Sequence, residues 1–351
     1  MGGYAGLMPA GALNVALSNF AKSYRNQKFI GDLFSPRVPV VKQTFQYIEW
    51  SEDDFRVPAT TLRAPGARPT SIRNNYGTDT YFCHSHALEG EVPFESEAYG
   101  LGLGFSTRQK LTASLTKKLN LSREVEVASR ALSLTSFPNG LAFSGTSMWD
   151  SYITTPANST FETVTSHPID DIETAKEALR QVGIADEEMV LALSSPVVRI
   201  LVNHPEIVHR FQYTNVLGII DIDKLSSVFG VKCVRAGAVQ LSQNNAKTWV
   251  WGNSAFLGYA QPAPSMEDLS CMKTFSWTGE EGGGVDAGLV AAGADGFAVL
   301  EWIDQHLSTK KYWQSAEWYY DTKVTAQETG YPLLNVVSGD VMEVVPADIE
   351  G

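Results

Sequence analysis

The feature that most constrains the fold is an amphipathic stretch at residues 106–134, which predicts a single long helix. Ser106 precedes this stretch as a candidate N-cap, and lysines and arginines occupy the side opposite its apolar stripe. A helix of about 28 residues is roughly 42 Å long, more than the usual helix of a globular protein. The stripe consists of Leu111, Leu115, Leu119, Val125, Ala128 and Leu132. We therefore expect a strut that crosses a whole subunit.

Two strand-like stretches before this helix predict a long β-arm. Residues 44–57 and 80–92 alternate in polarity as strands do. One face of the second stretch would carry Tyr81, Cys83, Ser85 and Ala87. The segment between the two stretches is too long for a tight hairpin turn. We expect the tip of the arm near "RAPGARP", residues 63–69.

The segment "TTLRAPGARPTSIR", residues 60–73, has an unusual charge for this chain. The formal net charge is −12, yet no Asp or Glu occurs between Arg56 and Thr78. Four arginines lie in that interval, and prolines with a glycine stiffen and turn it. One interpretation is an ordinary solvated loop, and the other is a contact segment that meets acidic residues elsewhere.

The rest of the chain predicts an α/β lobe at residues 165–300, flanked by other elements. Residues 13–25 have helical spacing and suggest a short N-terminal helix or an extended arm. The segment "AVLEWIDQHL" suggests a helix or loop before aromatic-rich strands at 310–327 and 332–345. Within the lobe we expect helices at 170–182, 195–211 and 221–230, and strands at 188–195, 231–241, 248–260 and 272–279.

Composition places the chain among globular proteins, with 351 residues, 44% hydrophobic and 19% charged. The acidic balance argues against a general nucleic-acid binder, although it does not exclude a container that surrounds nucleic acid. Three widely spaced cysteines suggest free thiols in a reducing compartment. The sequence shows no basic region ahead of an apolar stretch and no run of about 18 apolar residues, so we expect neither a secretory signal nor a membrane span.

No motif for catalysis or metal binding is recognisable, so we expect no catalytic residue, no cofactor and no metal. His84 and His86 share one strand face, but a metal site needs a third ligand that nothing supplies. His204 and His209 are five residues apart, which is poor geometry for two ligands on one helix. The glycines of "GLGLGF" lack the spacing of a nucleotide-binding loop and suggest a hinge. A catalytic triad assembled only in space stays open.

Taken in order, these elements resemble those of a tailed-phage major capsid protein of the HK97-like fold. The likeness spans roughly residues 15–345 and depends on the serial order of four weak motifs. These are "SMWDSYITTPANSTFETV" at 147–164, "SSPVVRILVNHPEIVHRFQY" at 194–213, "LSSVFGVKCVRAGAV" at 225–239 and "VWGNSAFLGYAQPAPS" with "KTFSWTG" at 250–279.

The resemblance implies an α+β fold with five parts and no enzyme activity. An N-terminal arm at 1–35 would precede an extended loop at 44–94. A peripheral domain at 95–164 would contain the spine helix at 106–136, and an axial domain would occupy 165–300. Residues 301–351 would be strands that return to the peripheral domain.

The resemblance also implies partners: copies of the chain in pentamers and hexamers of an icosahedral shell around double-stranded DNA, and a portal protein at one vertex. The shell would belong to the virion and assemble in the bacterial cytoplasm. No long charged extension precedes the arm, so either scaffolding is a separate protein or the chain is already the mature form; we expect the separate scaffolding protein, and no membrane partner. Some relatives crosslink their subunits through a loop lysine, but no Lys occurs here between Lys42 and Lys110. Such a shell would be held only by non-covalent contacts, so a cement protein that binds and stabilises it is a reasonable further partner.

Under this interpretation the extended loop lies across a neighbouring subunit, where its arginines meet acidic residues. The candidate contact residues are Arg56, Leu62, Arg63, Arg68, Ile72 and Arg73. Candidate acidic partners are the clusters Glu52–Asp54, Asp170–Glu173, Asp186–Glu188 and Glu280–Glu281. Two alternatives stay open: an encapsulin-like nanocompartment of the same fold with protein cargo, and a cytosolic α/β enzyme with a β-rich appendage.

Overall fold

The computed structural model describes residues 12–13, 29–49, 62–63, 65–66, 68, 77–154, 166–212, 220–241, 247–260, 265, 269–279, 297–304 and 310–339. Its helices are α2 (Gly31–Phe34), α3 (Phe94–Gly102), α4 (Thr107–Ala131), α5 (Ser151–Thr154), α6 (Pro168–Gln181), α7 (Ser195–Val202), α8 (Pro205–Gln212) and α9 (Ile222–Phe229). Its strands are β1 (Ala12–Leu13), β2 (Arg37–Val40), β3 (Thr44–Glu49), β4 (Gly77–Phe82), β5 (His84–Pro93), β6 (Leu141–Ala142), β7 (Met189–Ser194), β8 (Lys232–Ala236), β9 (Val239–Leu241), β10 (Lys247–Trp249), β11 (Ala255–Tyr259), β12 (Met272–Trp277), β13 (Phe297–Asp304), β14 (Lys311–Val324) and β15 (Gly330–Leu334).

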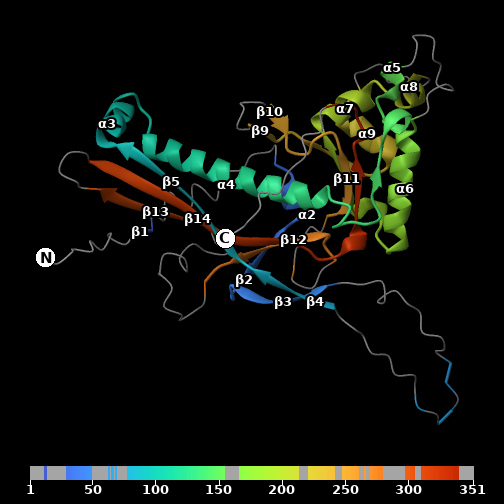
Figure 1. Cartoon of the computed structure of the whole chain (residues 1–351), viewed down its shortest axis with the longest axis horizontal. Coiled ribbons are helices and arrows are strands. Elements are labelled where there is room, and N and C mark those ends of the chain that lie inside the picture. The colour runs from blue at the N-terminus through green and yellow to red at the C-terminus, as the bar shows by residue number, and fades with distance from the viewer. Residues whose placement is uncertain are drawn as a thin grey trace.

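The molecule is elongated, with a long β-sheet at one end and an α/β lobe at the other (Figure 1). This sheet is here called the arm, a name that refers neither to the predicted β-arm at 44–94 nor to the N-terminal arm. The arm is a six-stranded sheet in the order β1-β13-β14-β12-β2, and β5 pairs with the other edge of β14. The lobe contains a five-stranded sheet in the order β6-β15-β11-β7-β8. Helix α4 runs along the arm and reaches the lobe, so it joins the two sheets (Figure 1).

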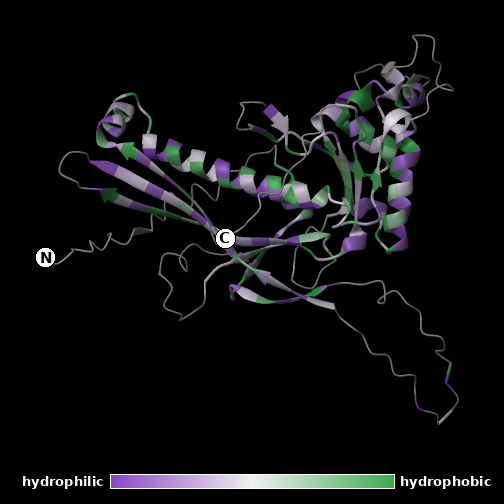
Figure 2. Ribbon diagram, in the orientation of Figure 1, coloured by the Kyte–Doolittle hydropathy of each residue, from purple (hydrophilic) through white to green (hydrophobic). Residues whose placement is uncertain are grey.

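Helix α4 confirms the predicted strut. The Ser106 side chain accepts a hydrogen bond from the Gln109 backbone N–H at 3.4 Å, which is the expected N-cap contact. Leu115 and Leu119 pack into a cluster with Trp318 and other side chains of β13 and β14. Farther along, Val127, Ala128 and Ala131 join a second core beneath the lobe sheet. Figure 2 shows hydrophilic and hydrophobic residues alternating along α4, as expected for a helix with one covered side and one open side.

Gly90 of β5 leaves room for a side chain of the first turns of α4. A Cβ atom at this position would lie 2.8 Å from Leu111 Cδ1, closer than two carbon atoms normally approach. A side chain there would force the Leu111 side chain to shift.

The lobe sheet is a middle layer with a core on each face. Every residue of β7 is buried, as the apolar run at 189–193 predicts. Leu191 and Leu193 face the core formed with α6, α7 and α9, whereas Val190 and Ala192 face the core formed with α2 and the end of α4. Covering both faces explains why β7 shows no alternation between polar and apolar residues.

Several of the sequence-based predictions were wrong in part. The stretches 231–241 and 248–260, each expected to be one strand, are β8 with β9 and β10 with β11. Residues 297–304 form strand β13, not a helix or loop, because pairing with β14 along their whole length outweighs local propensity. The expected strand at 80–92 is two strands that meet at Cys83, since β4 pairs with β3 and β5 pairs with β14. The expected helix at 195–211 is interrupted before Pro205, whose ring disfavours a helical residue at His204. For residues 13–25 we expected a short helix or an extended arm; Leu13 lies in strand β1, which agrees with the extended arm, and residues 14–25 lie outside the described part.

The domain boundaries remain a prediction, and sheet membership crosses two of them. β12, inside the predicted axial range, pairs with β14 of the arm. β15, inside the predicted returning strands, pairs with β11 and β6 of the lobe. The chain therefore passes between arm and lobe more often than a division into consecutive segments implies.

Candidate assembly interface

The base of the predicted loop is an antiparallel pair, β3 and β4, in register from Thr44 opposite Phe82 to Glu49 opposite Gly77. Tyr47 and Tyr81 are buried and pack on the ring of Phe275 in β12, with ring centroids 5.2 and 4.5 Å apart. The strand pair predicted from the sequence is confirmed over these residues. Its attachment to β12 fixes the base of the loop on the arm sheet.

The tip of the loop is exposed where the structure describes it. Leu62 is 93% exposed, and Arg63 and Arg68 are exposed as well. Gly66 has a φ of +83°, so the predicted turn at "RAPGARP" requires a glycine at this position. Arg56, Ile72 and Arg73 lie outside the described residues. An exposed leucine between arginines suits a contact made with another chain.

Two of the acidic clusters are partly neutralised within the subunit. Glu173 accepts hydrogen bonds from Lys176 and Arg180 at 2.8 Å each, and Asp186 accepts two from Arg180 at 2.8 and 2.6 Å. Hydrogen bonds from Lys176 and Arg180 lower the pKa of Glu173, and those from Arg180 lower the pKa of Asp186. These two carboxylates already have cationic partners.

Three exposed carboxylates of the same clusters do not take part in these ion pairs. Asp170, Glu187 and Glu188 form no hydrogen bond or ion pair through their side chains with other described residues. The two remaining clusters, Glu52–Asp54 and Glu280–Glu281, lie outside the described part of the chain. Among the described acids of these clusters, Asp170, Glu187 and Glu188 therefore remain available to a cation from outside the subunit.

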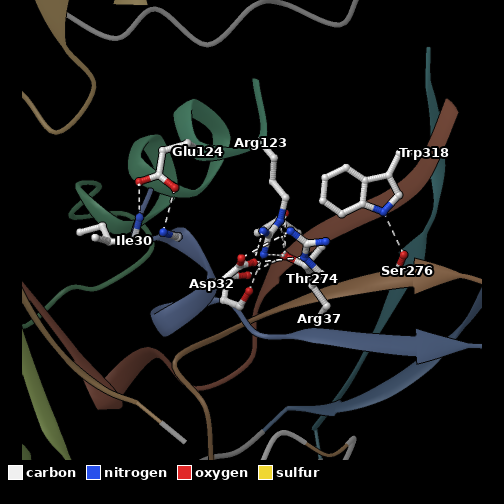
Figure 3. A network of polar contacts seen from close by, with 11 residues as sticks. Ile30, Asp32, Arg37, Arg123, Glu124, Thr274, Ser276 and Trp318 are labelled. Atoms are coloured by element: carbon white, nitrogen blue, oxygen red, sulfur yellow. Dashed lines mark hydrogen bonds and ion pairs between the residues drawn. The ribbon is translucent and has the colours of Figure 1, made fainter. Parts of the chain in front are cut away.

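A polar network, buried except at Asp32, fastens the end of the predicted N-terminal arm to α4 (Figure 3). Arg123, only 4% exposed, pairs with Asp32 of α2 and donates to the Ser35 carbonyl at 2.6 Å and to Thr274 Oγ1 at 3.0 Å. Arg37 also donates to Asp32, at 3.1 Å. Burial would raise the pKa of Asp32, but the charges and hydrogen bonds of Arg123 and Arg37 outweigh it and lower the pKa to about 2.

Glu124, the next residue of α4, is 3% exposed, and its side chain binds backbone N–H groups of the same segment. Its two carboxylate oxygens accept the N–H groups of Ile30 at 3.0 Å and Gly31 at 2.8 Å, and the indole N–H of Trp251 at 2.8 Å. Burial raises the pKa of Glu124, although these hydrogen bonds and Arg123 oppose the shift. One carboxylate thus joins α4, α2 and the turn after β10. We call Asp32, Arg123, Glu124, Trp251 and Thr274 the anchor network.

The anchor network was not predicted, because the lysines and arginines of α4 were all expected on its open side. A signal was present, since Arg123 continues the four-residue spacing of Leu115 and Leu119. A charged residue at a core position of a helix needs a partner of opposite charge. Its partner Asp32 lies 91 residues earlier, so spacing along the helix does not reveal it.

The buried pair Ser166 and His204 resembles part of a catalytic site, but its hydrogen bonds oppose that role. His204 Nδ1 accepts from the Glu206 backbone N–H at 3.3 Å, so the ring proton is on Nε2. Nε2 lies 3.0 Å from Ser166 Oγ and donates to it. A general base must accept the serine proton, so this histidine in this tautomer does not activate Ser166.

Burial lowers the pKa of His204 to about 4, and the charge of His167 adds to the shift. The unfolded chain, with an ordinary histidine pKa, binds this proton between about pH 6.5 and 4, whereas the folded chain does not. The contribution to folding stability is therefore complete above about pH 6.5 and is lost as the pH falls toward 4, by up to about 3 kcal/mol. Urea unfolding across this range should show the loss, and His204→Asn should reduce it. His209→Asn removes an exposed histidine nearby and is the matched control; equal pH dependence in both variants would contradict the prediction.

The cysteines and other candidate ligands carry no reactive site within the described residues. Cys83, Cys233 and Cys271 are free and buried. Burial raises the pKa of Cys83 to about 12 and that of Cys233 to about 11, so both remain protonated at neutral pH. His86 stacks on Tyr320 instead of facing a metal. In the described ranges, no group of three or more His, Cys, Asp or Glu side chains is arranged to hold a metal ion, and no helix is long and apolar enough to cross a membrane.

No protein-family model matches the chain, but individual proteins do. The major capsid protein of Burkholderia phage BcepMu is 26% identical over 246 residues, which cover 69% of this chain and 75% of that protein. The major capsid protein of Pseudomonas phage JBD67 is 26% identical over 277 residues, or 76% of this chain and 82% of that protein. Both relatives are structural proteins of phage shells.

Two solved structures share the fold over nearly the whole chain. A phage-related protein from Bordetella bronchiseptica RB50 is 26% identical and superposes with a TM-score of 0.68, covering 93% of this chain and 98% of its own. The capsid of cyanophage P-SCSP1u, at 11% identity, superposes with a TM-score of 0.54 and covers 95% of this chain and 92% of its own. The two relatives and the shared α+β architecture support a phage major capsid protein of the HK97-like fold, which is a structural protein.

Proposed function

We propose that the chain assembles with copies of itself into a closed icosahedral shell around the double-stranded DNA genome of a phage. The observation that carries the proposal is the capsid fold, which spans almost the full chain with both the arm and the lobe present. Large shells are stable because many modest contacts are repeated by symmetry. An elongated subunit with an exposed loop at its base offers several separate surfaces for such contacts.

The extended loop is the contact that we assign to a neighbouring subunit. Arg63 and Arg68 would meet carboxylates of that neighbour, while Leu62 would lose its exposure to water. Of the described acids in the candidate clusters, Asp170, Glu187 and Glu188 suit this role, since Glu173 and Asp186 already bind Lys176 and Arg180. Exposed pairs of this kind contribute about 0.2–1 kcal/mol each, so they set the register of the contact more than its strength.

Other partners follow from the same proposal. We assign to the shell a portal protein at one vertex and a separate scaffolding protein during assembly in the bacterial cytoplasm. The absence of Lys between Lys42 and Lys110 removes a crosslinking lysine from the loop. A cement protein bound to the shell surface is consistent with a shell that relies on non-covalent contacts.

The expressed protein, alone or with its scaffolding protein, should form large closed particles. Analytical ultracentrifugation should show megadalton species, and electron microscopy should show shells with icosahedral symmetry. A protein that stays monomeric or forms only small oligomers under both conditions would contradict the proposed assembly. Particles that enclose a protein cargo in place of DNA would favour the nanocompartment.

A further inference from the structure

The first half of α4 is unusual in charge for an acidic chain. From Ala98 to Arg123 the sequence contains no Asp or Glu, although the net charge of the whole chain is −12. The same interval contains five cations: Arg108, Lys110, Lys117, Lys118 and Arg123. Only carboxylates outside this segment can therefore neutralise its cations.

The two arginines have such partners within the subunit. Arg108 donates to Glu97 of α3 and to Glu301 of β13, at 3.3 Å each, and Arg123 pairs with Asp32. The three lysines form no ion pair with any carboxylate in the described part of the chain. Lys110 lies over the ring of Phe105, with Nζ 3.3 Å from the ring centroid, which leaves its charge unneutralised. Three unneutralised cations therefore remain on one rigid helix.

The exposed side of this helix is entirely polar. Lys110 and Lys117 are seven residues apart, so they lie on the same side of the helix and about 10 Å apart along its axis. No large hydrophobic side chain of α4 is among the exposed ones in the described structure. The exposed residues, here called the lysine face, are Gln109, Lys110, Ser114, Lys117, Lys118 and Ser122.

This composition fits a nucleic-acid backbone better than a protein surface. Protein interfaces are depleted in lysine and depend on aromatic or aliphatic anchors, which the lysine face lacks. Phosphate groups are commonly bound by lysine together with serine, asparagine and glutamine. The spacing of about 10 Å corresponds to roughly three base-pair rises along a strand, so both lysines can contact one backbone.

We propose that the lysine face of α4 binds the phosphate backbone of duplex DNA inside the shell, without reading its sequence. The inference rests on the proposed function, and it requires that this side of α4 face the interior of the shell. Each lysine replaces one condensed counterion, so three contacts contribute about −2.7 to the slope of log K against log salt. This dependence weakens binding about 40-fold between about 50 and 200 mM salt. Such contacts hold DNA loosely and release it readily.

The test compares full-length subunits, dissociated from shells, in their binding to a fluorescent duplex of about 30 base pairs, which is longer than α4. Fluorescence anisotropy is measured from about 50 to about 200 mM NaCl. The variant K110Q/K117Q/K118Q removes the lysine face charge while keeping residues that favour helices. The control K232Q/K247Q/K310Q removes the same charge from exposed positions elsewhere. We expect at least tenfold weaker binding at low salt and a slope flatter by two to three for the first variant only.

Three outcomes would overturn the inference. The wild type fails to bind the duplex at about 50 mM NaCl, or both variants bind with the wild-type slope. The third is that K110Q/K117Q/K118Q binds DNA normally but no longer forms particles, which would make the lysine face a contact between subunits. Electron microscopy of the wild-type preparation separates these outcomes from failure of the proposed function, because shells that form normally leave that function intact.

Discussion

Glu124→Ala is expected to lower the free energy of unfolding by about 3 kcal/mol or more. The substitution leaves three buried donors without an acceptor: the backbone N–H groups of Ile30 and Gly31 and the indole N–H of Trp251. Each unsatisfied buried donor costs about 1–3 kcal/mol, and a small cavity adds to the loss. Arg123 would also lose a neighbouring negative charge. Urea or thermal unfolding of the unassembled subunit measures the effect.

Two further variants test the cause of that loss. Glu124→Gln keeps the size and one carbonyl oxygen, but its amide N–H₂ faces backbone donors, so we expect an intermediate loss. Glu187→Ala makes the same change as Glu124→Ala at an exposed site and should change stability by no more than about 0.5 kcal/mol. If Glu124→Ala were as stable as Glu187→Ala, the anchor network would contribute nothing to folding.

Reversing charge at both Arg63 and Arg68 should leave the subunit folded and reduce closed particles at least tenfold. Each reversal replaces an attraction of about 0.2–1 kcal/mol by a repulsion of similar size, so a subunit contact loses roughly 1–4 kcal/mol. A loss of 1.4 kcal/mol is tenfold in an equilibrium constant, and a shell repeats it at every subunit. Both side chains are exposed, so their replacement removes no contact within the described core.

Particle yield is measured by sedimentation and electron microscopy of R63E/R68E beside the wild type, and circular dichroism checks that the subunit is folded. The variant R63K/R68K keeps both charges and should form nearly normal numbers of particles, because an exposed pair depends mainly on charge. Wild-type yields from R63E/R68E would rule out a role for these arginines in assembly. Equal losses in both variants would indicate that the guanidinium shape, and not the charge, makes the contact.

The elements that the sequence predicts well are those whose signals lie close together along the chain. Helix α4 begins at the expected N-cap, because Ser106 and Gln109 are three residues apart and the apolar stripe repeats every turn. Strand β7 is apolar from Met189 to Leu193, which indicates burial on both faces without knowledge of the neighbours. The serial order of such elements was also enough to identify the family resemblance.

The elements that were missed depend on partners far away in the sequence. Residues 297–304 become a strand only because β14 pairs with them, and β15 enters the lobe sheet because β11 and β6 offer edges. The anchor network joins Glu124 to Trp251 across 127 residues. No local pattern specifies such a pairing, because its free energy comes from packing and hydrogen bonds made after the chain has closed long loops.

The candidate interface divides in the same way. The sequence alone determined that an acid-free, arginine-rich segment lies between two strands, since charge and turn residues are properties of the segment itself. Only the tertiary structure decided which carboxylates are free to meet those arginines, because Lys176 and Arg180 already bind Glu173 and Asp186. It likewise decided which cations of α4 remain unneutralised. Whether a charge is available depends on its neighbours in space, and the fold brings those neighbours from distant parts of the chain.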